Sequence, residues 1–375
     1  MSNSCKAVAA LAASLMLTSR RSKRGESDPV RLTCACDASG VVVLFYKYVS
    51  VPLGDPQSIA KNILAWTASR PEEKITGKIR LAREGINASF ASSNANVVEE
   101  FIAFLESTRE LELVGTDYKR ERACEHAFAS LSVRVVEELC PFGEPDLGVE
   151  NVKNVTSLSP QAWDESLRTR DETSTTVLDV RNFYESRIGH FRGATLAPIR
   201  RFSQLKDWMA NEDAIKRIEG RDVFIFCTGG VRCEKVGSYL MEKLPPERRP
   251  RSVKKLEGGI VAYAREFEDG GLFQGSNYVF DARGSVPVGP TNKENLPETS
   301  RCDGCAEPSG RLSKCVGRNC HIVLIACETC GDTVYCCSLC REQTERSEGV
   351  DKFKRRACEC DCFESRERRC APPAR

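Results

Sequence analysis

The chain of 375 residues has little histidine, little net charge and no long apolar run. A net charge of +2, with 29% of residues charged, excludes a strongly polyionic protein, so any basic footprint for nucleic acid must be local. No segment approaches the roughly 18 consecutive apolar residues of a membrane helix, so we expect no membrane span. With 3 histidines, no two-histidine, one-carboxylate iron site is evident, and no flavin, haem or dinucleotide motif is found.

Cysteine is abundant instead, and it is unevenly distributed. Of the 20 cysteines, 13 lie between Cys302 and Cys370. In a long, enzyme-like chain, closely spaced pairs at one end favour metal ligands over disulfides or free thiols. Four short pairs provide eight ligands, enough for two structural zinc ions: Cys302, Cys305, Cys315, Cys320, Cys327, Cys330, Cys337 and Cys340.

Two features of this zinc prediction stay open. The pairs can combine sequentially or as an interleaved cross-brace, and Cys336 or His321 can replace one of the assigned ligands. No open coordination position or nearby general base is apparent, which favours a structural site over a catalytic one. The cysteines of the polar end of the chain are predicted to be unligated: Cys358, Cys360, Cys362 and Cys370.

Both ends of the chain are set apart by composition. Residues 1–40 begin with five bases, five serines and no acid before Glu26, around an apolar run from Ala7 to Leu17. This mixture is typical of an organelle (mitochondrial or plastid) transit peptide, and equally of a disordered extension on a cytoplasmic protein. Residues 346–375 form a charged tail.

Residues 41–140 predict an α+β domain of the ferredoxin-like, split βαβ type. Strands are expected at 41–49, 78–82, 88–90 and 131–136, with a tight turn at 84–87. One helix follows the capping residue Asp55, and a second is capped by Asn94 or Asn96. The resulting order is β-α-β-β-α-β.

A linker (141–158), rich in Pro, Gly and Asp, precedes a second domain at 159–283. There, strands expected at 177–180, 223–226 and 253–256 alternate with helices near 201–210, 233–244 and 260–267. Such alternation predicts an α/β domain with a central parallel sheet. A second linker (284–300) leads to a small Cys-rich, zinc-binding-like module at 301–345.

The strand-to-helix turn after Phe226 carries the candidate chemistry. Cys227 ends an apolar strand, the loop Thr228, Gly229, Gly230 and Val231 follows, and Arg232 starts a helix. Backbone N–H groups of such a turn, the helix N-terminus and the guanidinium all favour an anionic sulfur. We therefore predict a reactive thiolate at Cys227 rather than a buried structural cysteine. Neighbouring Cys233 is either a resolving thiol or a packing residue.

This loop resembles the active-site loop of the rhodanese superfamily. Leu178-Asp179-Val180-Arg181, Gly189 to Ala194 and Leu256 to Ile260 agree with the resemblance, which implies a rhodanese domain in which Cys227 carries a persulfide beside Arg232. It also marks Asp179 and Arg181 as supporting residues. The loop of related phosphatases resembles Cys-x5-Arg, whereas the loop from Cys227 to Arg232 is Cys-x4-Arg. The shorter loop favours sulfur chemistry over phosphate hydrolysis.

A closer resemblance extends over about 41–340. The motifs Phe45 to Val49, Lys78 to Asn87, Asp179 to Glu185, Cys227 to Lys235 and Phe280 to Arg283 are similar to those of the oxygen-dependent tRNA uridine hydroxylases. The resemblance implies 5-hydroxylation of the wobble uridine (34) of tRNA, with tRNA as partner and molecular oxygen as co-substrate. The residues themselves do not explain how oxygen would be activated.

Two basic groups are candidates for contacts with tRNA phosphates: Lys78, Arg80 and Arg83, and then Lys119, Arg120 and Arg122. Arg200 and Arg201 are candidates to join them. A solvated charged face is the alternative for each of these residues.

The alternative function is a sulfurtransferase that moves sulfane sulfur from a donor through Cys227 to a thiol acceptor. A zinc-bearing binding module with an inactive loop is a third hypothesis, and the sequence specifies no oligomeric state.

Overall fold

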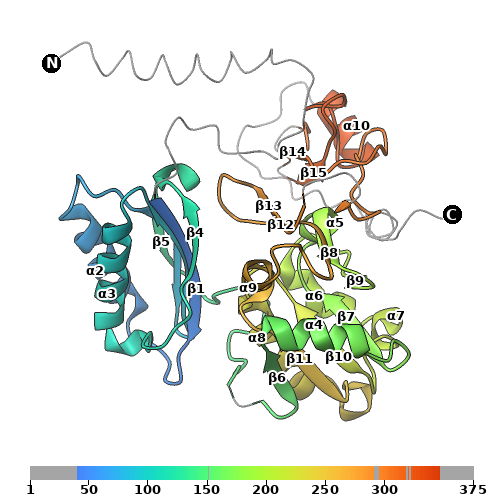
Figure 1. Ribbon diagram of the computed structural model, residues 1–375, viewed down its shortest axis with the longest axis horizontal. Helices are drawn as coiled ribbons and strands as arrows, with labels where there is room; N and C mark the ends of the chain where they lie inside the picture. Colours follow the sequence, from blue (N-terminus) through green and yellow to red (C-terminus); the bar gives the residue numbers. More distant parts are fainter. Residues whose placement is uncertain (1–39, 151, 291–294, 318–319, 321, 347–375) are drawn as a thin grey trace.

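A computed structural model describes residues 40–150, 152–290, 295–317, 320 and 322–346. The extension predicted at 1–40 and the tail predicted at 346–375 therefore lie almost wholly outside the described residues. Figure 1 shows an N-terminal sheet with helices on its outer face, a second body built on a parallel sheet, and a small C-terminal module near α5. Among the described residues, no helix is both long and apolar enough to cross a bilayer.

The N-terminal sheet has five strands in the order β4-β1-β3-β2-β5. Its strands are β1 (Gly40–Tyr48), β2 (Thr76–Ala82), β3 (Gly85–Ser92), β4 (Lys119–Ala123) and β5 (Leu131–Val135). Helices α2 (Pro56–Ala68) and α3 (Ala95–Ser107) cover one face, and Asp55 and Asn94 cap them by accepting hydrogen bonds from the N–H groups of Ser58 and Asn96. The predicted ferredoxin-like class is confirmed.

Two details of this domain differ from the prediction. The edge strand beside β1 is β4, whose residues were predicted only as a basic group. The strand that was predicted to come last is an additional edge strand on the other side, β5, parallel to β2. The hairpin turn comprises Arg83 and Glu84, because Ala82 already pairs with Gly85. β4 was not predicted as a strand because four of its five residues are charged and none of them is β-branched or aromatic.

Side-chain alternation gives this sheet two different faces. Val43 and Phe45 of β1 point toward α2 and α3 and are completely buried there. Leu44 and Tyr46 occupy the other face, which neither α2 nor α3 covers. That second face is turned toward the parallel-sheet domain.

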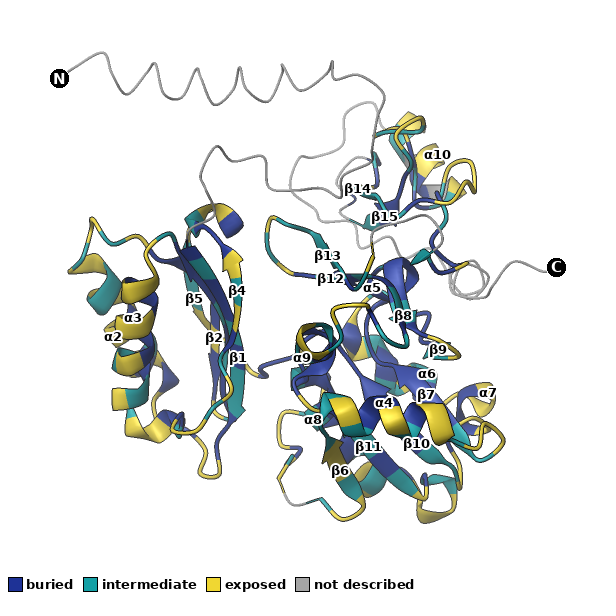
Figure 2. Ribbon diagram, in the orientation of Figure 1, coloured by how far each residue is buried: buried dark blue, intermediate teal, exposed yellow. Residues whose placement is uncertain are grey.

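The second domain has a parallel sheet in the order β6-β11-β10-β7-β9. The strands are β6 (Val155–Leu158), β7 (Thr175–Asp179), β9 (Thr195–Leu196), β10 (Asp222–Phe226) and β11 (Ser252–Leu256). One face packs on α6 (Leu205–Met209), α7 (Glu212–Ile215) and α8 (Val231–Ser238), and the other on α4 (Pro160–Thr169) and α9 (Gly259–Glu266). Figure 2 shows the strands buried between helices with exposed outer faces, which confirms the predicted α/β architecture.

The two segments predicted as linkers contain structure. β6 lies within 141–158 and forms the edge of the parallel sheet next to β11, so its four residues belong to that domain. β13 (Ser285–Pro287) lies within 284–300 and pairs with β12 (Phe273–Tyr278), which also pairs with β8 (Gly189–Phe191). Both strands are short and join existing sheets, which explains why turn-rich composition concealed them.

Candidate functional site

The predicted loop lies at the carboxyl end of β10. Cys227 follows the strand, and its Sγ accepts a hydrogen bond of 3.1 Å from the N–H of Gly230. Gly230 has φ = 102°, a conformation that side chains with a Cβ rarely adopt. A Cβ on Gly230 would also lie 2.8 Å from the hydroxyl of Tyr46. The loop therefore needs glycine both for its turn and for its contact with β1.

Cys227 is completely buried, and its surroundings favour the thiolate. Burial alone would raise the pKa of Cys227, but a hydrogen bond from Cys233, the charge of Arg232 and the N–H groups of Arg232 and Gly230 lower that pKa to about 6. Burial and the neighbouring Cys227 raise the pKa of Cys233. Cys233 thus stays protonated as a donor, a role that neither predicted alternative included.

A carboxylate from another helix holds the guanidinium of Arg232. Glu185 of α5 (Phe183–Ile188) accepts hydrogen bonds from Arg232 at 2.9 and 2.7 Å, and both side chains are almost fully buried. A further hydrogen bond of 3.3 Å joins Arg232 to the hydroxyl of Thr228. Glu185 was missed as a site residue, although it stands inside the Asp179 to Glu185 motif.

Asp179 and Arg181 form a second buried ion pair at the end of β7. Their closest atoms are 2.6 Å apart, and neither side chain is exposed. The guanidinium of Arg181 also donates to the carbonyl of Gly189, 2.6 Å away. Neither residue lines the pocket described next. These contacts join the end of β7 to Gly189 at the start of β8.

A cavity of about 590 Å³ lies between the uncovered face of the N-terminal sheet and the Cys227 loop. Both domains contribute its walls, and Cys227, Thr228, Gly229, Val231 and Arg232 line it on one side. Its aromatic lining comprises Tyr46, Phe128, Tyr184, Phe202 and Phe280. The thiolate therefore faces a partly open pocket of the size and mixed polarity expected for a small planar ligand.

The predicted basic residues divide between this cavity and other surfaces. Those that line it are Lys78, Arg80, Lys119, Arg200 and Arg201, joined by Arg283, which was not predicted. The remaining three, Arg83, Arg120 and Arg122, do not line the cavity. Arg120 instead pairs with Glu99 of α3 at 2.9 Å, because alternation along β4 places it on the opposite face from Lys119. Lys119 is itself buried and pairs with Asp117 at 3.1 Å.

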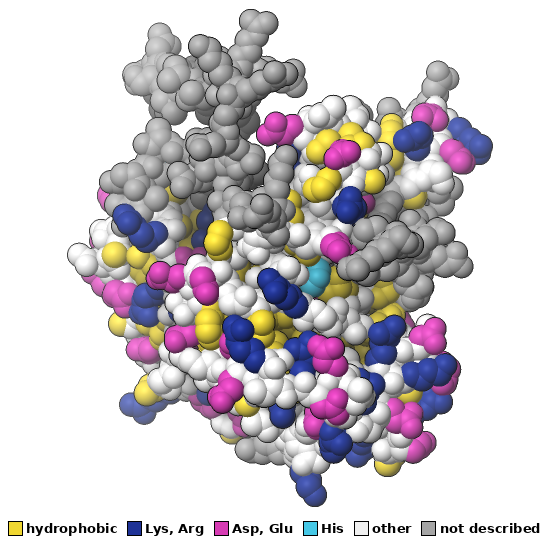
Figure 3. Space-filling model, turned by 45° about the vertical axis from the view of Figure 1, so that its right-hand side comes forward, with side chains coloured by type: hydrophobic (Ala, Val, Ile, Leu, Met, Phe, Trp, Pro, Cys, Tyr) yellow, Lys and Arg dark blue, Asp and Glu magenta, His cyan; other side chains and the backbone are white. Residues whose placement is uncertain are grey.

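The outer surface carries no single-sign field on the face shown in Figure 3, where basic and acidic side chains are interspersed. This agrees with the net charge of +2. The local positive charge of the cavity is therefore the more specific electrostatic feature.

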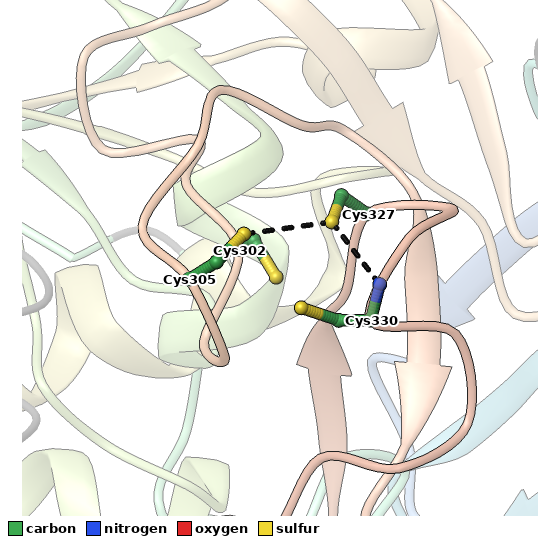
Figure 4. A group of neighbouring side chains, drawn as sticks. All are labelled: Cys302, Cys305, Cys327 and Cys330. Atoms are coloured by element: carbon green, nitrogen blue, oxygen red, sulfur yellow. Dashed lines mark hydrogen bonds between the residues drawn. The ribbon is translucent and has the colours of Figure 1, made fainter.

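The C-terminal module holds two groups of four cysteines, and their pairing is interleaved. The first group combines the first and third pairs, Cys302, Cys305, Cys327 and Cys330, shown in Figure 4. The second combines Cys315, Cys320, Cys336 and Cys340. The assignment of Cys337 as a ligand was wrong. Cys336 takes its place because its thiol lies 3.8 Å from that of Cys320. His321 lies outside the described residues.

The spacing of the sulfur atoms fits a tetrahedral metal ion. Sulfurs bound to zinc at about 2.3 Å stand about 3.8 Å apart in a tetrahedron. Cys305 and Cys327 are 3.6 Å apart, as are Cys315 and Cys340. A Cβ on Gly304 or Gly317 would approach a cysteine sulfur of its group to 2.9 or 2.2 Å, so glycine keeps each cradle open. Both groups can therefore hold a metal ion.

Three family models match the chain in succession. They are described as a UPF0176 acylphosphatase like domain (residues 40–139), a Rhodanese-like domain (162–266) and Rhodanase C-terminal (274–343). Fold and loop thus define a rhodanese-domain protein with an acylphosphatase-like domain in front of it.

Full-length relatives narrow this class. The chain is 31% identical to the "tRNA uridine(34) hydroxylase" of Bacillus mycoides (strain KBAB4), over 76% of this chain and 84% of that protein. It is 31% identical to a protein of the same name from Staphylococcus haemolyticus, over 76% and 83%. It is 32% identical to "Rhodanese-like domain-containing protein 6" of Arabidopsis thaliana, over 80% of this chain and 52% of that protein. The chain belongs to the tRNA uridine(34) hydroxylase family.

Proposed function

We propose that this protein is an oxidoreductase that hydroxylates uridine 34 of tRNA at ring carbon 5, with Cys227 as its reactive group. The observation that carries the proposal is the position of Cys227, whose stabilised thiolate borders a partly open cavity between two domains. Family membership supports the substrate, since the named bacterial relatives are tRNA uridine(34) hydroxylases.

The cavity is suited to a base that has left its stack. Position 34 belongs to a single-stranded loop, and enzymes that modify such bases bind them singly, by aromatic stacking and by hydrogen bonds to their edges. Tyr46, Tyr184 and Phe280 supply aromatic surface from both domains, and Arg232 supplies a cation beside the thiolate. Lys78 and Arg80, both exposed at the cavity, are proposed to contact the flanking phosphates.

The reaction needs an oxidant and a source of electrons. Replacing the C5–H bond by C5–OH takes one atom of molecular oxygen into the product, and the second leaves as water after an external reductant supplies two electrons. The sulfur of Cys227, as thiolate or persulfide anion, is proposed to add to C6 of the uracil ring, which breaks the C5–C6 π bond and makes C5 nucleophilic toward oxygen. The sulfur leaves C6 again when the hydroxylated C5 loses its proton, which restores the double bond. Reaction under oxygen-18 gas should yield a heavier hydroxyuridine, whereas labelled water should not.

The two cysteine groups are proposed to hold one structural zinc ion each. All ligands in each group are thiolates, the donor set that zinc prefers in structural sites, and four ligands complete its tetrahedron. The ions would stabilise the module and take no part in the reaction.

A sulfurtransferase remains the second candidate function. The six-residue loop, with backbone N–H groups directed at Sγ of Cys227, also suits a bound persulfide. In that case Cys227 would accept sulfane sulfur from thiosulfate and pass it to a thiol.

Comparison of tRNA nucleosides from cells with and without the gene distinguishes these functions. Mass analysis should detect 5-hydroxyuridine or its derivatives with the wild-type gene. Cys227→Ser should abolish them, and Cys124→Ser, which changes a buried cysteine outside the cavity, should preserve them. Unchanged nucleosides beside strong thiosulfate-to-cyanide transfer would reject the hydroxylase in favour of the sulfurtransferase.

A further inference from the structure

Helix α5 connects the reactive loop to the cysteine-rich module. Within its six residues, Glu185 contacts Arg232 of the loop, and Arg187 contacts the module. Both side chains are at least 97% buried, so both ion pairs are shielded from solvent. The β12–β8 sheet and β15 (Val323–Ile325) also pack near this helix.

The start of the module and the residues just before it hold Arg187 by every nitrogen of its guanidinium. One terminal nitrogen donates to both carboxylate oxygens of Asp303, at 2.9 and 3.1 Å. The other donates to the carbonyl of Arg301 at 2.7 Å, and Nε donates to the carbonyl of Thr299 at 3.3 Å. The hydroxyl of Thr299 returns a hydrogen bond to the Arg187 carbonyl at 3.2 Å. This planar, four-bonded contact fixes orientation as well as distance.

Asp303 belongs to the framework of the first cysteine group. It directly follows Cys302, and its carboxylate accepts the N–H of Ile325 at 3.0 Å, while its own N–H donates to the carbonyl of Ile325 at 2.7 Å. Ile325 lies two residues before Cys327. Asp303 therefore connects the two halves of the group, and a metal ion that joins Cys302 to Cys327 also holds Asp303 in place.

We infer that Arg187 is a positioning residue: through α5, it makes the placement of the Arg232 guanidinium beside Cys227 depend on the metal-loaded state of the first cysteine group. The inference rests on the proposed roles of Cys227 and of the metal. If α5 shifts, the carboxylate of Glu185 moves with it and takes the bound guanidinium of Arg232 away from Cys227. The attraction between that guanidinium and the thiolate weakens as their distance grows. Release of Arg187 should therefore make the thiolate of Cys227 less favourable.

The pH midpoint for alkylation of Cys227 by iodoacetamide, followed at its own peptide by mass spectrometry, measures this effect without tRNA. The test changes none of the titratable or charged groups that face Cys227, which are Arg232 and Cys233 of α8, Tyr46 of β1 and Cys140. Failure of the hydroxylase proposal therefore leaves this measurement intact.

In Arg187→Met, the midpoint should rise by about one pH unit, which corresponds to about fivefold slower alkylation at pH 6. Arg187→Lys should give a smaller rise, because it keeps the charge without the planar fork. Removal of metal from the wild-type protein by a chelator should raise the midpoint similarly, and it should add little in Arg187→Met. Arg311→Met is the control, since the hydrogen bond and ion pair of this less buried arginine, to the carbonyl of Ala326 and to Asp332, both stay within the module.

An unchanged midpoint in folded Arg187→Met would overturn the inference. If that variant does not fold, Arg187→Lys and the chelated wild-type protein decide, and an unchanged midpoint in either one has the same consequence. A rise in Arg187→Met without one in the chelated protein would reject the dependence on metal. Zinc analysis and circular dichroism of each sample show whether the module and the fold are retained.

Discussion

At the scale of single residues, reactivity depends on which groups surround one sulfur atom. The Cys-x4-Arg spacing predicted Arg232 and the loop amides as neighbours of Cys227, because these belong to one short segment. Cys233 entered the prediction only as a resolving thiol or a packing residue, yet it is among the groups that lower the pKa of Cys227. A helix that starts inside the loop turns this side chain back toward the sulfur.

Replacement of Cys233 by alanine should raise the pKa of Cys227. A hydrogen bond to a charged group is worth about 1.5–3 kcal/mol, which corresponds to a rise of about 1–2 pH units. In the wild-type protein, with the Cys227 pKa near 6, alkylation should increase with pH through that value and level off above it, because only the thiolate reacts. The midpoint for Cys233→Ala should be correspondingly higher.

Cys124→Ala provides the control for this experiment, since Cys124 is also buried but does not line the cavity. Its midpoint should equal that of the wild-type protein. Equal midpoints for Cys233→Ala and the wild type would contradict the assignment of Cys233 as donor.

At the scale of elements, β-branched and aromatic composition predicted the apolar strands, and no such composition marks the charged strand β4. The run Val41 to Val49 predicted β1 correctly. The run Lys119 to Ala123 carries four charged residues, so only its pairing with β1 identifies it as a strand. Once it is known to be a strand, its period of two explains why Lys119 reaches the cavity and Arg120 does not.

The cysteine module offers a test at this same scale, because two adjacent cysteines have different assigned roles. Cys336→Ser should lose about one zinc ion per chain, since it removes one of the four thiolates of the second group. Cys337→Ser should keep the zinc content of the wild-type protein. Zinc analysis of both purified variants makes the comparison, and a reversed result would restore Cys337 as the ligand.

At the scale of the whole molecule, a buried lysine connects the reactive helix to the N-terminal domain. Lys235 of α8 has no exposed surface, and its amine lies 2.6 Å from Glu84 of the β2–β3 turn. It also donates to the carbonyl of Glu144 at 2.8 Å, and Glu138 lies 3.8 Å away. Tyr46 adds a second contact between the domains through Glu234, at 2.9 Å. These contacts hold together the two walls of the cavity.

Lys235→Met should lower the free energy of unfolding by about 3–5 kcal/mol, because it leaves the Glu84 carboxylate partly buried without its cation. Urea denaturation measures the loss. Lys216→Met is the control, since Lys216 pairs with Asp213 on the exposed surface and should change stability by less than about 1 kcal/mol. Equal effects of the two variants would show that Lys235 does not hold the domains together.

Local patterns were sufficient for the two main domain classes, the Cys227 loop and seven of the eight cysteines in the two groups, since helix caps, side-chain periods and cysteine spacing act between residues close in sequence. The grouping of Cys302 with Cys327, the approach of Glu185 to Arg232 and the union of Tyr46 with Cys227 in one cavity required the folded chain. These residues are far apart in sequence. Strand order and domain contact bring them together, and neither follows from local spacing.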